Sequence, residues 1–167
     1  MTEDLLKPTH VPLPGGIAPK QVSAGFGLSL VLGSDRRVYA LVPGGLVDGV
    51  KDGRLVPTRV DLPGDVPAQN VFAGNAYALT LGDNGQLYAW GHNSEGQLGD
   101  DTGEKRAHPT RVVFPEGVSV RHATAGVYFS LAVASDGHLY AWGLNQNGWL
   151  GVSDDRLSVL RPRRVSA

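Results

Sequence analysis

The 167-residue chain contains no cysteine, so it has neither disulfide bonds nor thiolate chemistry. No apolar run approaches the roughly 20 residues that a membrane-spanning helix needs, and the first ten residues lack the basic region and apolar core of a secretory signal. The net charge of −1 provides no strong field to attract nucleic acid or an anionic membrane surface. We therefore predict a soluble cytoplasmic protein without membrane contacts, and we disfavour nucleic acid as a partner.

Helical periodicity is also missing, whereas glycine and proline are abundant. The chain has 23 glycines and 11 prolines, which is typical of many short strands joined by turns. Hydrophobic residues make up 41% of the sequence, enough to bury a core. These features predict an all-β protein.

The chain is built from repeats. Residues 73–99 and 125–151 share an Ala-Gly start, two apolar runs around a turn, Leu-Tyr-Ala-Trp-Gly, and a closing Gly-x-Leu-Gly, and residues 24–45 are a diverged copy. The Ala-Gly glycines lie 49 and 52 residues apart, at Gly25, Gly74 and Gly126. A Pro-x-x-Val motif recurs at steps of 49, 52 and 53 residues, starting at Pro8, Pro57, Pro109 and Pro162. Two independent markers therefore agree on the period.

Repeats of this length, rich in glycine, tryptophan and short strands, indicate the blades of a β-propeller. In the second strand of repeat 2, Leu87 and Ala89 point one way while Tyr88 and Trp90 point the other, so both sides are apolar. A sheet packed between two neighbours has this pattern, whereas a sheet with one wet face alternates polar and apolar residues. We predict that Trp90 and Trp142 are buried between blades and have a structural role.

The hairpin turns carry their own signal. Gly85 and Gly137 follow Asp-Asn and Ser-Asp, and tight hairpin turns need positive φ angles, which glycine adopts at little cost. Arg36 stands at the equivalent position of the first repeat, so we expect a less ideal turn there.

Four segments follow from the repeat markers. We predict an N-terminal outer-strand segment at residues 1–21, a degenerate repeat 1 at 22–70, repeat 2 at 71–119, and repeat 3 with a C-terminal outer strand at 120–167. The Pro-x-x-Val motif of residues 8–11 matches the outer-strand motifs of the later repeats. It is the basis for assigning the first segment.

These motifs resemble the repeats of the regulator of chromosome condensation family. The match rests on the Ala-Gly start, Ala-Leu or Ser-Leu, the acidic-x-Gly turn, Leu-Tyr-Ala-Trp-Gly, Asn93 or Asn145, Gly-Gln-Leu-Gly and Pro-x-x-Val. The resemblance implies a β-propeller of four-stranded blades, usually seven, and a role as an interaction platform. Family members include a nucleotide exchange factor for a small nuclear GTPase and chromatin binders, but no exchange residue can be assigned here. This chain has three repeats, and Leu28, Tyr77 and Phe129 replace a histidine that family repeats often carry.

The loops after the Ala-Gly pairs are the best candidates for a binding surface. Equivalent loops of a propeller share one rim, and exposed aromatic side chains on such loops are rigid anchors for a partner. The candidate binding residues are Phe26, Tyr77, Tyr128, Phe129, His92, Asn93 and Asn145. The alternative is that one residue of each loop, such as Leu28, Tyr77 or Phe129, caps the blade core.

No constellation of catalytic or metal-binding residues is apparent. The five histidines lack the spacing of a zinc site, and Asp100, Asp101 and Glu104 lack the spacing of a calcium loop, so we interpret them as a solvated acidic turn. Gly-x-Ser-x-Gly and phosphate-loop motifs are absent. We therefore predict no metal and no cofactor, and we assign no catalytic residue.

Two functions remain open. The first is a non-catalytic module that binds an unidentified protein through the aromatic rim, and the alternative is a small-molecule binder or enzyme with an apolar axial pocket formed by a dimer. A third possibility, a nucleosome or nucleic-acid partner, is disfavoured by the net charge.

Three repeats leave two apolar sheet faces open, so we expect a homodimer that closes a six-bladed ring. A fragment of a longer propeller and a back-to-back dimer of half-rings are the alternatives.

Overall fold

A computed structural model describes residue 8 and residues 10–41 and 56–166. In this part of the chain, three four-stranded antiparallel sheets each consist of consecutive strands. Sheet 1 contains β1 (Pro19–Gly25), β2 (Leu28–Gly33), β3 (Val38–Leu41) and β4 (Thr58–Val60). Sheet 2 contains β5 (Ala68–Ala73), β6 (Tyr77–Gly82), β7 (Leu87–Gly91) and β8 (Arg106–Arg111). Sheet 3 contains β9 (Val120–Ala125), β10 (Phe129–Ala134), β11 (Leu139–Leu144) and β12 (Ser158–Arg164).

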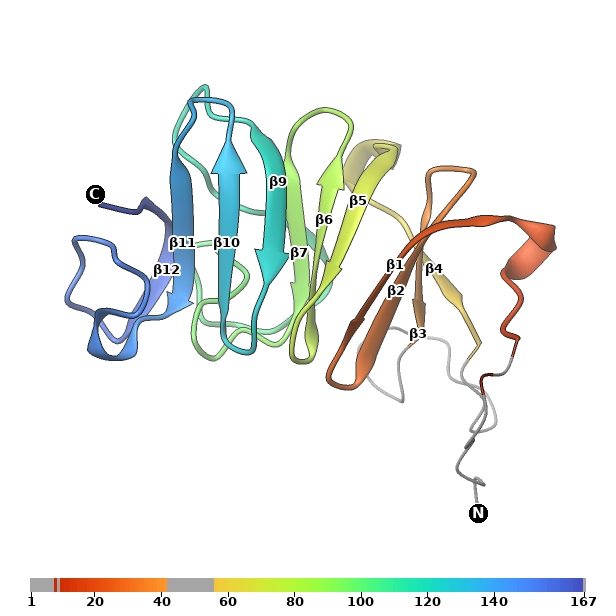
Figure 1. The fold of residues 1–167 in the computed structure, drawn as a ribbon, viewed down its shortest axis with the longest axis horizontal. Helices are drawn as coiled ribbons and strands as arrows, with labels where there is room; N and C mark the ends of the chain where they lie inside the picture. The colour runs from red at the N-terminus through yellow and green to blue at the C-terminus, as the bar shows by residue number, and fades with distance from the viewer. Residues whose placement is uncertain (1–7, 9, 42–55, 167) are drawn as a thin grey trace, which may run out of the picture.

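The sheets follow one another in chain order (Figure 1). Neighbouring sheets meet through their first two strands, since β5 contacts β1 and β2, and β9 contacts β5 and β6. The first strand of each sheet therefore lies on the side where neighbouring sheets meet. The last strands, β4, β8 and β12, lie at the opposite edge of their sheets. The only helical elements described are the short 3₁₀ turns Pro14–Gly16, Pro63–Asp65 and Gln146–Gly148. This arrangement confirms the predicted all-β fold of propeller blades.

The hairpin turns have the predicted backbone. Gly85 and Gly137 have φ angles of 74° and 80°, and Arg36 takes the same left-handed conformation at 61°. A residue with a side chain pays about 1–2 kcal/mol for that conformation, so the first hairpin has the less ideal turn that its sequence predicts.

The sheets pack face to face through apolar side chains. Trp90 belongs to the cluster between sheets 1 and 2, and Trp142 to the cluster that spans sheets 2 and 3. Their side chains are 1% and 0% exposed. The Trp142 indole also donates a 2.9 Å hydrogen bond to the Gln97 carbonyl of sheet 2. Both tryptophans are therefore buried between sheets, as predicted.

The first strands of the sheets start at residues 19, 68 and 120, against expected repeat starts at 22, 71 and 120. The outer-strand segment expected at the N-terminus forms no strand before Pro19 among residues 8 and 10–18. Val11 is 50% exposed, whereas Leu13 is buried. A β-strand needs a neighbouring edge, and no described strand pairs with this segment, so its role as an outer strand stays a prediction. Residues 1–7 and 9 lie outside the described residues.

Candidate functional site

The turns after β1, β5 and β9 form a continuous rim at one end of the sheets (Figure 1). The Ala76 amide donates to the Phe26 carbonyl at 3.2 Å, and the Asn75 amide donates to the Gly126 carbonyl at 3.3 Å. Each turn is thus hydrogen-bonded to the turn of the next sheet. We call residues 24–28, 73–77 and 125–129 the axial rim.

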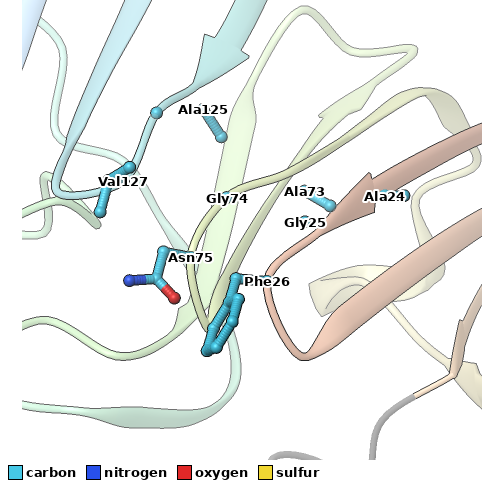
Figure 2. A pocket seen from close by; sticks show the side chains of 9 residues that line it. Ala24, Gly25, Phe26, Ala73, Gly74, Asn75, Ala125 and Val127 are labelled. Carbon is cyan, nitrogen blue, oxygen red and sulfur yellow. The ribbon is translucent and has the colours of Figure 1, made fainter.

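The axial rim borders a shallow hollow of about 520 Å³ that is open to solvent. Figure 2 shows the side chains of Phe26, Asn75 and Val127 on the three turns that border it. The lining residues are Ala24, Gly25, Phe26, Ala73, Gly74, Asn75, Ala125, Gly126 and Val127. None of these nine side chains is ionisable, so the hollow offers apolar contact and hydrogen bonding but no proton transfer.

Close approach of two turns explains the glycine of the first Ala-Gly pair. A Cβ atom added to Gly25 would lie 2.0 Å from the carbonyl oxygen of Gly74 in the next sheet. That distance is far inside van der Waals contact with a backbone atom, so glycine is required for the two turns to pack. At Gly74 and Gly126 the constraint lies within the turn itself, because an added Cβ would lie 2.2 Å from the Tyr77 ring and 3.2 Å from the Phe129 ring.

The four predicted aromatic residues separate into different environments. Phe26 is 82% exposed and Tyr128 is 40% exposed, whereas Phe129 is half-buried. Only Phe26 among them lines the hollow. Asn75 and Val127 occupy the same repeat position as Phe26, directly after Ala-Gly, and were not selected from the sequence because they are not aromatic. That shared position was the signal that could have identified them.

The prediction that Tyr77 belongs to an exposed rim surface is wrong. Its side chain is 0% exposed, because it inserts between sheets 2 and 3. The Tyr77 hydroxyl donates to the Phe129 carbonyl at 2.6 Å and lies 3.0 Å from the Ser130 hydroxyl oxygen. Burial raises the pKa of Tyr77 well above its ordinary value. Tyr77 and Leu28 are both buried and therefore cap the blade core, which was the alternative to a binding role.

His92 lies on the loop that follows β7 and is exposed. Its backbone amide donates to the Ala76 carbonyl of the axial rim at 2.9 Å, and its Nε2 lies 2.9 Å from the Ser94 hydroxyl oxygen. The structure therefore places His92 at the same end of the sheets as the hollow but not among the residues that line it.

The two candidate asparagines lie in the interior, not on a binding surface. Asn93 is 1% exposed: its Nδ2 donates to the carbonyls of Thr102 and Glu104, both at 3.0 Å, and its Oδ1 accepts from the Leu98 amide at 2.9 Å. Asn145 is 4% exposed and repeats this pattern in sheet 3. Each asparagine closes the long loop before the outer strand, which corrects their assignment as surface-binding residues.

One carboxylate of the acidic turn is buried, although the sequence predicted that the turn is solvated. The Asp100 side chain is only 2% exposed and pairs with Arg106, Nε to Oδ2, at 2.6 Å. Burial acts to raise the pKa of Asp100, but hydrogen bonds from Thr102 and Arg106 outweigh it and hold that pKa below its ordinary value. The prediction of a solvated turn is therefore wrong for Asp100, whose carboxylate closes the same loop as Asn93.

The loop of sheet 2 also joins the sheet to its neighbour. The Asp101 amide donates to the Leu160 carbonyl of β12 at 3.0 Å, and the Ser158 hydroxyl donates to Glu95 at 3.1 Å. Arg161 forms an ion pair with Asp101. The end of the molecule that carries the axial rim is thus held together by contacts between sheets.

Three similar sheets, side by side and meeting at their first strands, define a propeller-type repeat protein. Two models of the regulator of chromosome condensation (RCC1) repeat match the sequence, one at residues 84–133 and 136–167 and the other at residues 69–97 and 120–148. The chain belongs to the RCC1 repeat family.

Curated relatives share segments of the chain. It is 38% identical over 79 residues to the ultraviolet-B receptor UVR8 of Arabidopsis thaliana, covering 47% of this chain and 18% of the receptor. It is 40% identical over 78 residues to human alsin, covering 47% of this chain and 5% of alsin. The chain therefore spans a small part of the length of these relatives.

Solved structures match most of the chain. Human WBSCR16 superimposes with a TM-score of 0.79 at 20% identity, over 94% of this chain and 42% of that one. Yeast RCC1 (Prp20), in a structure with Kap60 bound, superimposes with a TM-score of 0.74 at 25% identity, over 92% of this chain and 38% of that one. The described sheets thus have the fold of somewhat under half of each of these chains.

None of the helices that the structure describes has the length and apolar character needed to cross a membrane.

Proposed function

We propose that the chain is a non-catalytic interaction module that binds a partner protein through the axial rim, with Phe26 and Tyr128 as its anchors. The observation that carries this proposal is the 82% exposure of Phe26 on a turn that is hydrogen-bonded to the next turn of the rim. A large aromatic side chain on a rigid turn loses little conformational entropy on binding. Protein binding by relatives supports the choice of partner class: yeast Prp20 is described with Gsp1p, histones and Kap60.

A second candidate function is the binding of an apolar small molecule in the hollow. Its volume of about 520 Å³ is in the range of small-molecule pockets. The lack of ionisable groups among its lining residues favours binding over catalysis. In this case Val127 and Asn75, as well as Phe26, would contact the ligand.

Affinity capture with matched variants tests the first function. We expect Phe26→Ala to weaken capture of the proteins enriched by the native chain by at least about tenfold, since aromatic anchors at interface centres carry more than 1–2 kcal/mol. Val113→Ala is the control, because Val113 is also exposed, at 39%, and does not line the hollow. Quantitative mass spectrometry of the captured proteins gives the readout. Equal capture by native protein and Phe26→Ala would contradict a rim-binding function.

We also propose that a second copy of the chain is a partner. Val22 and Val133, on the first and last sheets, are 72% and 43% exposed, and apolar sheet faces of this kind are normally covered. We expect light scattering at low micromolar concentration to give twice the 17.6 kDa mass of the chain. A stable species of 17.6 kDa would contradict self-association and would leave the rim proposal untouched.

A further inference from the structure

Each sheet has a forward face, which points toward the next sheet along the chain. Three equivalent positions mark this face: Leu30, Leu32 and Val38 in sheet 1, Leu79, Leu81 and Leu87 in sheet 2, and Leu131, Val133 and Leu139 in sheet 3. The marker residues are at most 6% exposed in sheets 1 and 2, where the next sheet covers them. In sheet 3, Val133 and Leu139 are 43% and 41% exposed and line a groove of about 110 Å³. Among the described residues, no sheet covers this face.

The backward face of each sheet points toward the preceding sheet. Its marker residues are Val22, Ser29, Val31 and Leu41 in sheet 1, Val71, Ala78, Thr80 and Trp90 in sheet 2, and Ala123, Ser130, Ala132 and Trp142 in sheet 3. Val71 and Ala123 are 0% and 1% exposed, but Val22 at the same register is 72% exposed. No described sheet covers the backward face of sheet 1, whereas the preceding sheet covers that face in sheets 2 and 3.

The two contacts inside the chain show what covers such faces. In both, the forward face of one sheet packs on the backward face of the next, once between sheets 1 and 2 and once between sheets 2 and 3. No contact in the described chain pairs two forward faces or two backward faces. The described part of the chain thus contains two examples of one type of contact, and no described sheet lies against the forward face of sheet 3 or the backward face of sheet 1.

We propose that the forward face of sheet 3 docks on the backward face of sheet 1 in a second copy of the chain. This inference rests on the proposed self-association and specifies its surfaces. Because the same contact forms twice in a two-fold pair, both unused faces of both copies are covered. The pair has six sheets, within the usual range of about four to eight blades in a closed propeller.

Trp149 is the anchor of the proposed contact. It occupies the position of Gln97, whose carbonyl accepts 2.9 Å hydrogen bonds from the Ser130 hydroxyl and the Trp142 indole of the next sheet. Gln97 is 0% exposed, but Trp149 is 62% exposed. Ser29 of sheet 1 is the equivalent of Ser130, so it supplies the hydroxyl donor for the Trp149 carbonyl in the second copy. An exposed tryptophan beside an apolar face is the usual composition of an interface centre.

Opposite charges placed on the two faces test the contact. Val133→Lys alters the forward face of sheet 3, and Val22→Glu alters the backward face of sheet 1; both positions are exposed, so neither change should unfold the chain. Val113→Lys is the matched control, because Val113 is exposed and occupies the position of Asp61, which is already charged in repeat 1. Sedimentation velocity over a concentration series measures the dissociation constant of each variant, and circular dichroism checks its fold.

We expect Val133→Lys and Val22→Glu each to raise the dissociation constant of the dimer by at least about 30-fold, and Val113→Lys to leave it unchanged. An equimolar mixture of the first two variants should recover the dimer, because one contact is then native and the other pairs lysine with glutamate. If either variant loses its fold, Trp149→Ala replaces it and should weaken the dimer.

Three outcomes would overturn the proposal in distinct ways. If the native chain dimerises and both Val133→Lys and Val22→Glu leave the dimer intact, the dimer uses other surfaces. Self-association would then be correct, and the assignment of the two faces would be wrong. A dimer broken by Val133→Lys but not by Val22→Glu would pair two forward faces. A native chain that stays monomeric would remove the self-association proposal as well.

Discussion

Trp142→Ala is expected to lower the free energy of unfolding by about 3–5 kcal/mol, the range for truncating a fully buried tryptophan. The Trp142 ring is 0% exposed, contacts Phe114 edge-on at a centroid distance of 5.6 Å, and donates its indole hydrogen to the Gln97 carbonyl. Alanine leaves a cavity between two sheets that cannot collapse without moving them, and it leaves that carbonyl with one donor fewer. Chemical denaturation followed by circular dichroism measures the loss.

Phe26→Ala is the control for Trp142→Ala. It also truncates an aromatic side chain, but one that is 82% exposed, so we expect a change within about 0.5 kcal/mol. The same comparison applies to Trp90, which is buried between sheets 1 and 2. Equal stability of native protein and Trp142→Ala would show that sheets 2 and 3 do not pack through this face.

Asn93→Leu is expected to destabilise the protein by about 3 kcal/mol. Leucine has nearly the same size but leaves three backbone groups without their partner, namely the buried amide of Leu98 and the partly buried carbonyls of Thr102 and Glu104. Each buried polar group that loses its hydrogen bond costs about 1–3 kcal/mol. Thermal and chemical unfolding measure the effect, and Asn145→Leu should reproduce it in sheet 3.

Asn75→Leu provides the matched control for Asn93→Leu, because Asn75 lines the hollow at the axial rim and its side chain makes no hydrogen bond within the described chain. We expect it to change stability by less than about 0.5 kcal/mol. A similar small effect of Asn93→Leu would refute the role of Asn93 in closing its loop. Because that loop contacts β12 through Asp101 and Leu160, Asn93→Leu should also increase amide hydrogen exchange in β12.

The repeat period, the strands and the hairpin turns were predictable because they depend on local patterns. Gly85 and Gly137 follow turn residues and adopt the positive φ that such turns need. Apolar residues on both sides of β7 predicted a sheet with neighbours on both faces, and Tyr88 and Trp90 pack toward sheet 1 while Leu87 and Ala89 pack toward sheet 3. These properties involve residues close together in the chain, where spacing determines conformation.

Local sequence patterns could not distinguish the exposed residues of the axial rim from the buried ones. Tyr77 and Tyr128 stand one position apart in their repeats, yet Tyr77 is 0% exposed and Tyr128 is 40% exposed. Asn93 looked like an accessible amide on a polar loop, but three backbone groups from residues five to eleven positions further along surround it. Composition and spacing describe which residues are present in a loop and do not show which way each side chain turns.

Local patterns along the chain were thus enough to establish a protein of three propeller repeats with buried tryptophans. Packing between sheets decided which of these side chains are accessible, because the burial of Tyr77 and the exposure of Val133 each depend on whether a described sheet lies beside them. Val133 and Leu81 occupy the same position in their repeats, and one is 43% exposed while the other is 1% exposed. Sheet 3 packs on sheet 2 and covers Leu81, whereas no described sheet covers Val133. The contact that buries Leu81 joins residues about 50 positions apart in the chain.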